Sequence, residues 1–213
     1  MKLIVPSLIA LNTVAAVAEV SSLEARAKIE ESYYPEISHS ILESDWSLYG
    51  CKIQKIEIRG KDPVTSETRS VNVSLYRPRK GSNGSVVMIL PPTGGVNILD
   101  RGYANELCSQ GITAAIVSRW TYQDETSLDF EMHNNGALRA LAAVRHVVEF
   151  LDSSDYNSIG VLGTSIGAVA GPLVLGFEPR VTAAALIAGS ANFTDIITTS
   201  DEKGAAQLRQ TRM

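Results

Sequence analysis

The chain has 213 residues, of which 45% are hydrophobic and 20% are charged, a composition that suits one globular domain with a packed core. Its formal net charge is −4, so no overall positive field attracts nucleic acid or anionic lipid, and we expect no nucleic-acid partner. The two cysteines, Cys51 and Cys108, are too few for a disulfide framework and have no metal-binding spacing. We therefore expect two buried free thiols and no metal site.

The first 18 residues have the pattern of a secretory signal peptide. Lys2 precedes the apolar run Leu3–Leu11, and the small-x-small sequence Ala16–Ala18 provides a cleavage site. The apolar run is too short to cross a bilayer, so we expect no membrane span. The alternative is an apolar helix that docks on the domain. The signal peptide predicts a periplasmic or secreted protein.

Residues 19–52 form an acidic N-terminal extension that we expect to be irregular; His39 within it has no assigned role. The domain proper is predicted over residues 53–213. It begins with two segments, IQKIEIRG at 53–60 and SVNVSLYRP at 70–78, in which apolar and polar residues alternate. Such alternation on either side of a polar, proline-containing stretch predicts an antiparallel strand pair.

Strands and helices then alternate along the chain. Apolar runs predict strands at 86–90, 112–118, 158–165 and 181–190, with helices at 99–111, 133–151 and 166–177 between them. This order predicts an α/β domain with a mainly parallel sheet, an antiparallel N-terminal strand pair and helices on both faces. In the second helix, His146 lies opposite the apolar stripe, so we expect it on the solvated surface.

The pentapeptide Gly163-Thr164-Ser165-Ile166-Gly167 matches the pattern G-x-S-x-G between a predicted strand and a predicted helix. Glycines without a Cβ let the strand and the helix approach while the serine adopts a strained backbone conformation that exposes its hydroxyl. The turn also lies at the carboxyl edge of the sheet, where α/β folds bind ligands. Ser165 is therefore the candidate nucleophile; the alternative is a glycine-rich packing turn with an incidental serine.

A nucleophilic serine requires an oxyanion hole, formed by N–H groups directed at the oxygen that becomes charged. Ile166 provides one by position, at the start of a helix whose dipole favours an anion. The second is expected from the loop after the first buried strand. Because Pro91 and Pro92 have no N–H, the candidates are Thr93 and, after it, Gly94.

The order of elements resembles that of the α/β-hydrolase superfamily over about residues 53–196. The order is strand-PPTGG-helix, then strand-helix, then strand-GTSIG-helix, then a strand. It is most similar to the secreted or dienelactone-hydrolase-like members that use serine. The resemblance implies hydrolysis of a carboxylic ester or related acyl bond through an acyl-serine intermediate. The substrate would be a small acyl compound, and no cofactor or metal would be needed. In the family, an acid and then a histidine follow the nucleophile.

The sequence departs from this pattern because its three histidines all precede Ser165. The family's last two strands are also missing, so we expect a hydrolase domain that is C-terminally incomplete and impaired as this chain. Two alternatives stay open: a non-catalytic chain, either a binding module or a vestigial fragment, or a hydrolase with an unusual base. Only His133 would suit as a base, because it is predicted just before the second helix, at the carboxyl edge of the sheet; a simple helix-start role is the alternative.

The C-terminal segment offers no clear partner for the serine. Asp195, Asp201 and Glu202 follow the last predicted strand, but we assign none of them a catalytic role. Thr199 and Glu202 form a capping box that predicts a further helix from about Ser200. Without later strands, the segment 181–190 becomes an uncharged apolar sheet edge.

Nucleotide binding is a second possible function. Thr93-Gly94-Gly95 lies in the first turn of a βαβ unit, and Arg119 ends the second strand, where a 2′-phosphate contact could form. The spacing G-x-G-x-x-G is absent, however, and no phosphate-binding G-x-x-x-x-G-K-[ST] occurs. The sequence therefore favours the hydrolase.

Overall fold

The computed structural model describes residues 36–47, 50–92, 94–118, 130–154, 156–189, 198–199 and 201. Side chains of the segment 130–137 are not among those described. The predicted signal peptide, residues 1–18, and the helix predicted from about Ser200 lie outside the described residues, except for the isolated positions named above.

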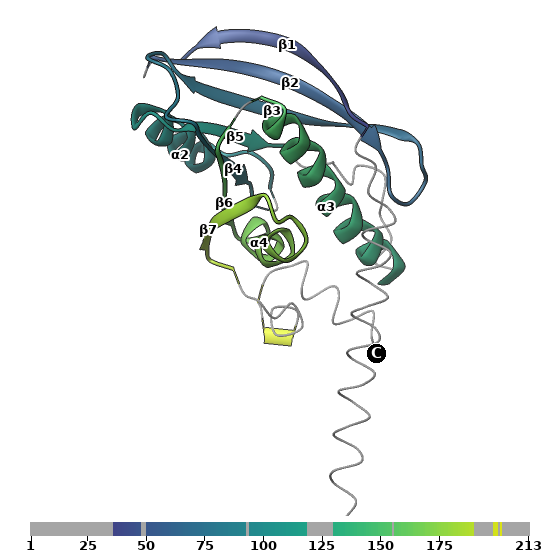
Figure 1. Cartoon of the computed structure of the whole chain (residues 1–213). Helices are drawn as coiled ribbons and strands as arrows, with labels where there is room; N and C mark the ends of the chain where they lie inside the picture. The colour runs from purple at the N-terminus through teal and green to yellow at the C-terminus, as the bar shows by residue number, and fades with distance from the viewer. Residues whose placement is uncertain are drawn as a thin grey trace, which may run out of the picture. The chain divides into compact units, whose positions relative to one another are not determined.

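The strands form one seven-stranded sheet in the order β1-β2-β3-β5-β4-β6-β7 (Figure 1). The pairs β1-β2, β2-β3 and β3-β5 are antiparallel. The pairs β5-β4, β4-β6 and β6-β7 are parallel. The predicted sheet, parallel in its second half with antiparallel strands at the N-terminal end, is confirmed. The strands are β1 Ser38–Trp46, β2 Cys51–Lys61, β3 Thr68–Pro78, β4 Ser85–Leu90, β5 Thr113–Val117, β6 Ser158–Thr164 and β7 Val181–Ile187.

Three helices lie on the two faces of the sheet: α2 Ile98–Ser109, α3 Phe130–Asp152 and α4 Ile166–Phe177 (Figure 1). On β2, Cys51 is bonded to α2, whereas Gly60 lies against the ring of His146 in α3. Positions nine apart on a strand point to opposite faces, so α2 and α3 cover opposite sides. Helix α4 contacts α3 and covers the same face of the sheet as α3. The predicted helices on both faces are thus confirmed.

Strand β1 corrects the expectation that residues 19–52 are irregular. Its nine residues are all exposed, so no face of the strand needs apolar side chains and its sequence has no alternating pattern. It is held by backbone pairing to β2 and by an ion pair of 2.7 Å between Glu43 and Lys55. Its charged side chains and the register shift between Ile41 and Glu43 protect this sheet edge from further pairing.

His146 was expected at the surface, and this is wrong: only 2% of it is exposed. The C-terminal half of α3 is covered on several sides, by the sheet, by α4 and by the ring contact of Phe150 with His39 of β1. The imidazole occupies the space left by Gly60, where even a Cβ would overlap the ring. Burial lowers the pKa of His146 from its ordinary value.

Cys51 and Cys108 form a disulfide, which corrects the expectation of two free thiols. Two cysteines allow a single pairing, but with 57 positions between them the sequence has no local sign that they lie close together. The bond joins β2 to the last turn of α2 inside a buried apolar cluster that includes Tyr76, Ala104 and Ile89. Helix α2 is thereby fixed to the sheet by a covalent link as well as by packing.

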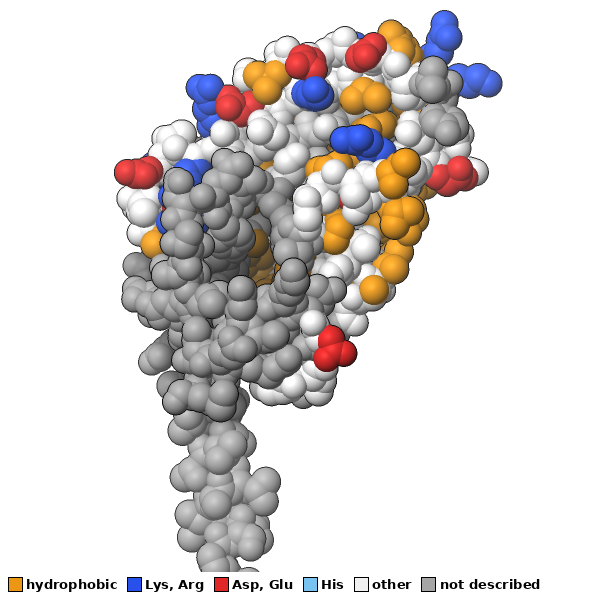
Figure 2. Space-filling view, turned by 180° about the vertical axis from the view of Figure 1, so that it is seen from behind, with side chains coloured by type: hydrophobic (Ala, Val, Ile, Leu, Met, Phe, Trp, Pro, Cys, Tyr) orange, Lys and Arg blue, Asp and Glu red, His pale blue; other side chains and the backbone are white. Residues whose placement is uncertain are grey.

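The other sheet edge, β7, contrasts with β1. Among the described strands it pairs only with β6, and all its residues after Val181 are exposed and uncharged. Leu186 and Ile187 are 41% and 40% exposed. The face in Figure 2 shows hydrophobic side chains gathered along one side of the molecule and charged ones mostly toward one end. The expected apolar, uncharged edge is therefore present.

None of the helices in the described part of the chain has both the length and the apolar character that crossing a bilayer requires.

Removing the disulfide should destabilise the domain. The chain-entropy relation gives about 4 kcal/mol for a loop of this length, so we expect Cys51→Ala/Cys108→Ala to lose about 2–4 kcal/mol of unfolding free energy. Denaturant unfolding of both proteins measures the loss. Dithiothreitol should lower the midpoint of the wild type and leave the variant unchanged; an equal response of both would contradict the disulfide.

Buried His146 should make stability depend on pH. Because its pKa is lowered in the folded state, the unfolded chain binds the proton first as the pH falls below about 6.5. The unfolding free energy should then fall by up to about 1.4 kcal/mol per pH unit, until the folded-state pKa is reached. His146→Phe should remove this slope in unfolding measurements between pH 7.5 and 5, with His146→Gln as a second variant. An unchanged slope in both would refute the assignment.

Candidate active site

Ser165 lies in the sharp turn between β6 and α4. Its φ is 55° and its ψ is −118°, a backbone conformation that is unfavourable for any residue with a Cβ. Its N–H donates to the carbonyl of Ile187 at 2.9 Å, while its side chain makes no capping hydrogen bond to the helix. The residue is half-buried. The predicted strained turn is thus present, with a hydroxyl that the helix does not use as its cap.

The glycines on either side of Ser165 allow unusually close packing. A Cβ on Gly163 would overlap the backbone of Gly167, and a Cβ on Gly167 would overlap the carbonyl of Leu90 at the end of β4. The parallel register places Leu90 opposite Gly163. Helix α4 therefore begins directly against the end of β4, and the loop that follows β4 starts beside Ser165.

That loop was expected to provide the second oxyanion donor. Thr93 lies outside the described residues, while Gly94 is exposed in a turn that the Gly95 N–H closes on the carbonyl of Pro92 at 3.0 Å. Gly95 has a φ of 83°, which glycine adopts without strain. The turn leads into the capped start of α2, where Asn97 accepts from Leu99 at 2.7 Å. The roles predicted for Thr93 and Gly94 stay predictions.

The start of α4 has amide groups available for an anion. The N–H groups of Ala168 and Val169 donate to the Ser165 carbonyl at 2.9 and 3.0 Å. The amides of Ile166 and Gly167 have no acceptor within the helix, as at every helix start. The helix dipole adds positive potential at the same place. The backbone is therefore suited to hold negative charge beside Ser165.

The far end of α4 is fixed by polar contacts that the sequence motif did not reveal. Arg145 of α3 donates to the carbonyl of Phe177 at 2.6 Å. Just beyond the helix, Arg180 donates to the buried carboxylate of Glu178 at 2.8 and 2.9 Å and to Glu149 of α3 at 2.8 Å. Arg145 and Glu149 lie about 30 positions before their partners at the end of α4, and the contacts follow no recognisable spacing. They hold the helix that presents Ser165.

The histidines are placed differently from the prediction. His133 lies inside α3, which begins at Phe130, and not ahead of the helix; its side chain is outside the described part. His146 packs on Gly60 of β2, which is four strand spacings from β6, or roughly 19 Å. His39 packs on Phe150. Neither His146 nor His39 is therefore a base for Ser165.

Other candidate groups fall largely outside the described residues. Asp195, Glu202 and Arg119 lie there, and Asp201 is exposed. Within the described ranges, no group of three or more His, Cys, Asp or Glu residues is arranged to hold a metal ion.

No protein-family model and no curated protein matches this sequence. Solved structures do match its fold. An acetyl xylan esterase from Paenibacillus sp. R4 aligns with a TM-score of 0.60 and 16% identity, over 88% of this chain and 64% of that one. Acetyl xylan esterase 1 from Thermoanaerobacterium sp. JW/SL YS485 aligns with a TM-score of 0.54 and 14% identity, over 87% and 64%.

A cold-adapted esterase from an Arctic intertidal metagenomic library aligns with a TM-score of 0.53 and 19% identity, over 68% of this chain and 64% of that one. The match thus spans less than two thirds of the length of these esterases. At such low identity the likeness establishes the fold alone. Together with the sheet order, it shows that this chain has an α/β-hydrolase-like fold.

Proposed function

We propose that this chain carries the nucleophile of a serine hydrolase that cleaves a carboxylic ester or related acyl bond. The observation that carries the proposal is the positive φ of Ser165 at the start of α4, with a hydroxyl free of helix capping. A residue with a Cβ adopts this strained conformation only where its surroundings enforce it, and such strain is concentrated at functional sites. The fold shared with solved esterases supports the same chemistry.

In the proposed reaction the Ser165 hydroxyl oxygen attacks the carbonyl carbon of the ester, and a base accepts its proton. The carbonyl oxygen becomes an anion that the Ile166 N–H holds, together with the N–H of Thr93 or Gly94. Collapse of this intermediate breaks the ester bond, and the leaving alcohol takes the proton from the base. Water then attacks the acyl-serine, which releases the acid and restores the hydroxyl.

The base is the missing part of this proposal. With His39 and His146 engaged in packing, His133 is the one histidine of the sequence left for the role. The alternative is a base and an acid from polypeptide that is not among these 213 residues, as the family resemblance implies. Under that alternative the chain by itself should have little or no turnover.

We also propose that the protein works outside the cytoplasm. The signal-peptide pattern of residues 1–18 motivated this location. The disulfide between Cys51 and Cys108 supports it independently, because structural disulfides persist in oxidising compartments.

Labelling with a fluorophosphonate tests the nucleophile. An activated serine attacks the phosphorus and displaces fluoride, which leaves a stable adduct that can be located by mass spectrometry. We expect labelling at Ser165 in this chain or in any longer product of the same gene, and none in Ser165→Ala. Ser158→Ala, at the other end of β6, is the matched control and should label like the wild type.

Equal labelling of the wild type and Ser165→Ala would refute the proposal. His133→Ala separates the two sources of the base. If His133 is the base, its removal should slow labelling at least a hundredfold, since general-base assistance contributes about 10²–10⁴. An unchanged rate excludes His133 as the base.

The close packing beside Ser165 predicts a sharp difference between two glycines of α4. Gly167→Ala should destabilise the domain and abolish labelling, because its Cβ would overlap the Leu90 carbonyl. Gly176→Ala has no atom within 4 Å of the added Cβ and should stabilise the helix by up to about 1 kcal/mol. Denaturant unfolding and fluorophosphonate labelling measure both effects; equal behaviour of the two variants would contradict the packing.

A further inference from the structure

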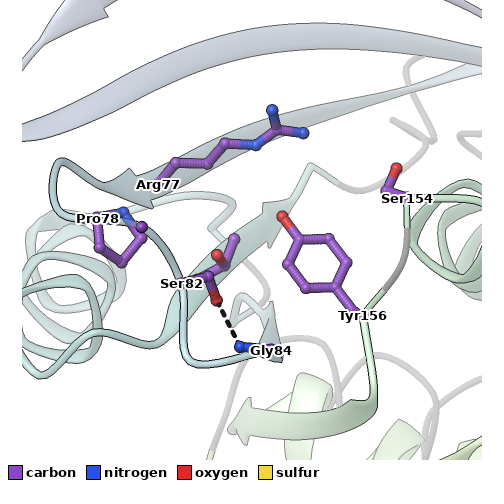
Figure 3. A pocket seen from close by; sticks show the side chains of 8 residues that line it. Arg77, Pro78, Ser82, Gly84, Ser154 and Tyr156 are labelled. Atoms are coloured by element: carbon purple, nitrogen blue, oxygen red, sulfur yellow. Dashed lines mark hydrogen bonds between the residues drawn. The ribbon is translucent and has the colours of Figure 1, made fainter.

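A pocket of about 330 Å³ opens at the amino ends of the parallel strands, away from Ser165. Thr113 is the first residue of β5, Gly84 directly precedes β4, and Tyr156 lies two residues before β6. Figure 3 shows this pocket from close by. Since Ser165 follows the carboxyl end of the seven-residue strand β6, the two sites are about 20 Å apart.

Among the described residues, the lining of this pocket has one cationic group, several hydroxyls and no carboxylate. Arg77 and Tyr156 extend toward the same space in Figure 3. Ser82 donates to the carbonyl of Ser85 at 3.3 Å, and Ser154 donates to the carbonyl of Phe150 at 2.8 Å. The two serine protons are thus engaged, which leaves Arg77, Tyr156 and Thr113 as the donors for a ligand.

Two of these donors are buried without a partner among the described residues. The Nε atom of Arg77 and the hydroxyl of Thr113 are both inaccessible and form no hydrogen bond there. Thr113 is 0% exposed and lines the pocket. Buried polar groups almost always have a hydrogen-bond partner, and two donors at one pocket require acceptors. A guanidinium beside hydroxyl donors is the arrangement that binds carboxylate and phosphate oxygens.

We propose that this pocket binds an oxyanion, a phosphate or a carboxylate, carried on a body about the size of a sugar. Arg77 is the cationic anchor, and Thr113 and Tyr156 donate hydroxyl hydrogen bonds. The volume lies at the lower end of the range for small-molecule sites, so it is larger than a bare inorganic ion needs. The rings of Pro78 and Tyr156 offer apolar walls for the body of the ligand. The site is independent of the proposed hydrolase chemistry.

Three sugars with a common ring test the proposal by titration calorimetry at constant ionic strength. Glucose 6-phosphate presents a phosphate, glucuronate a carboxylate, and glucose no charge. We expect saturable 1:1 binding of at least one of the two anions, and at least tenfold weaker binding of glucose. Binding of only one anion identifies which oxyanion the pocket takes. Failure of both anions, or equal binding of glucose, overturns the proposal.

Matched variants locate the binding. Arg77→Met should weaken binding of the anion at least tenfold, whereas Arg79→Met removes the same charge two residues away, outside the pocket lining, and should leave affinity within twofold. If the two variants weaken binding equally, general charge attraction explains it and the pocket assignment is wrong. Tyr156→Phe, which only removes a hydroxyl, is the second variant should Arg77→Met fail to fold.

Thr113→Val distinguishes a ligand-binding hydroxyl from a structural one. Because this buried hydroxyl has no partner in the described structure, its removal should leave the thermal unfolding midpoint unchanged or raised. Affinity for the anion should nevertheless fall several-fold. A lower midpoint with unchanged affinity would show that the hydroxyl serves the fold and would remove Thr113 from the site.

Discussion

The candidate site depends on one steric constraint, the absence of space for a side chain between Gly167 and the carbonyl of Leu90. This contact places the start of α4 against the end of β4. The chain can enter the helix there only through a sharp turn, and Ser165 takes the positive φ that the turn requires. The same contact brings the loop after β4 beside the serine. A packing requirement thus determines the backbone conformation, the position of the hydroxyl and the location of the neighbouring amides.

The two edge strands of the sheet, β1 and β7, differ in their side chains and in their ion pairs. The outer strand β1 has charged side chains among exposed hydrophobic ones, an ion pair with its neighbour and a register shift. These features discourage pairing with another strand. The outer strand β7 has no charged side chain, although its pairing with β6 also contains a register shift, between Ile159 and Gly160. It stands next to the strand that leads to Ser165. Among the described strands, the edge with charged side chains therefore lies far from the candidate site, and the uncharged edge lies directly beside it.

The sequence was informative where a local pattern reflects burial or backbone geometry. The apolar runs identified the parallel strands, and the spacing of Gly163, Ser165 and Gly167 predicted the strained turn. Strand β1 was missed because both of its faces are exposed, which removes the alternation that reveals a strand. The disulfide and the burial of His146 were missed because each depends on a partner far away in the sequence. Long-range pairings of this kind have no local signal.

The hydrogen bond from the Ser165 amide to the Ile187 carbonyl extends the β6-β7 ladder by one rung into the turn itself. One side of the peptide that carries the hydroxyl is therefore anchored to the outermost strand. Since that anchor fixes the nitrogen, the orientation of the Cα–Cβ bond of Ser165 depends on how well β7 is ordered. Fraying of this edge would release the Ser165 amide to solvent and let the serine relax toward ordinary torsion angles. The hydrogen-exchange rate of the Ser165 amide proton therefore reports whether the turn keeps its strained conformation.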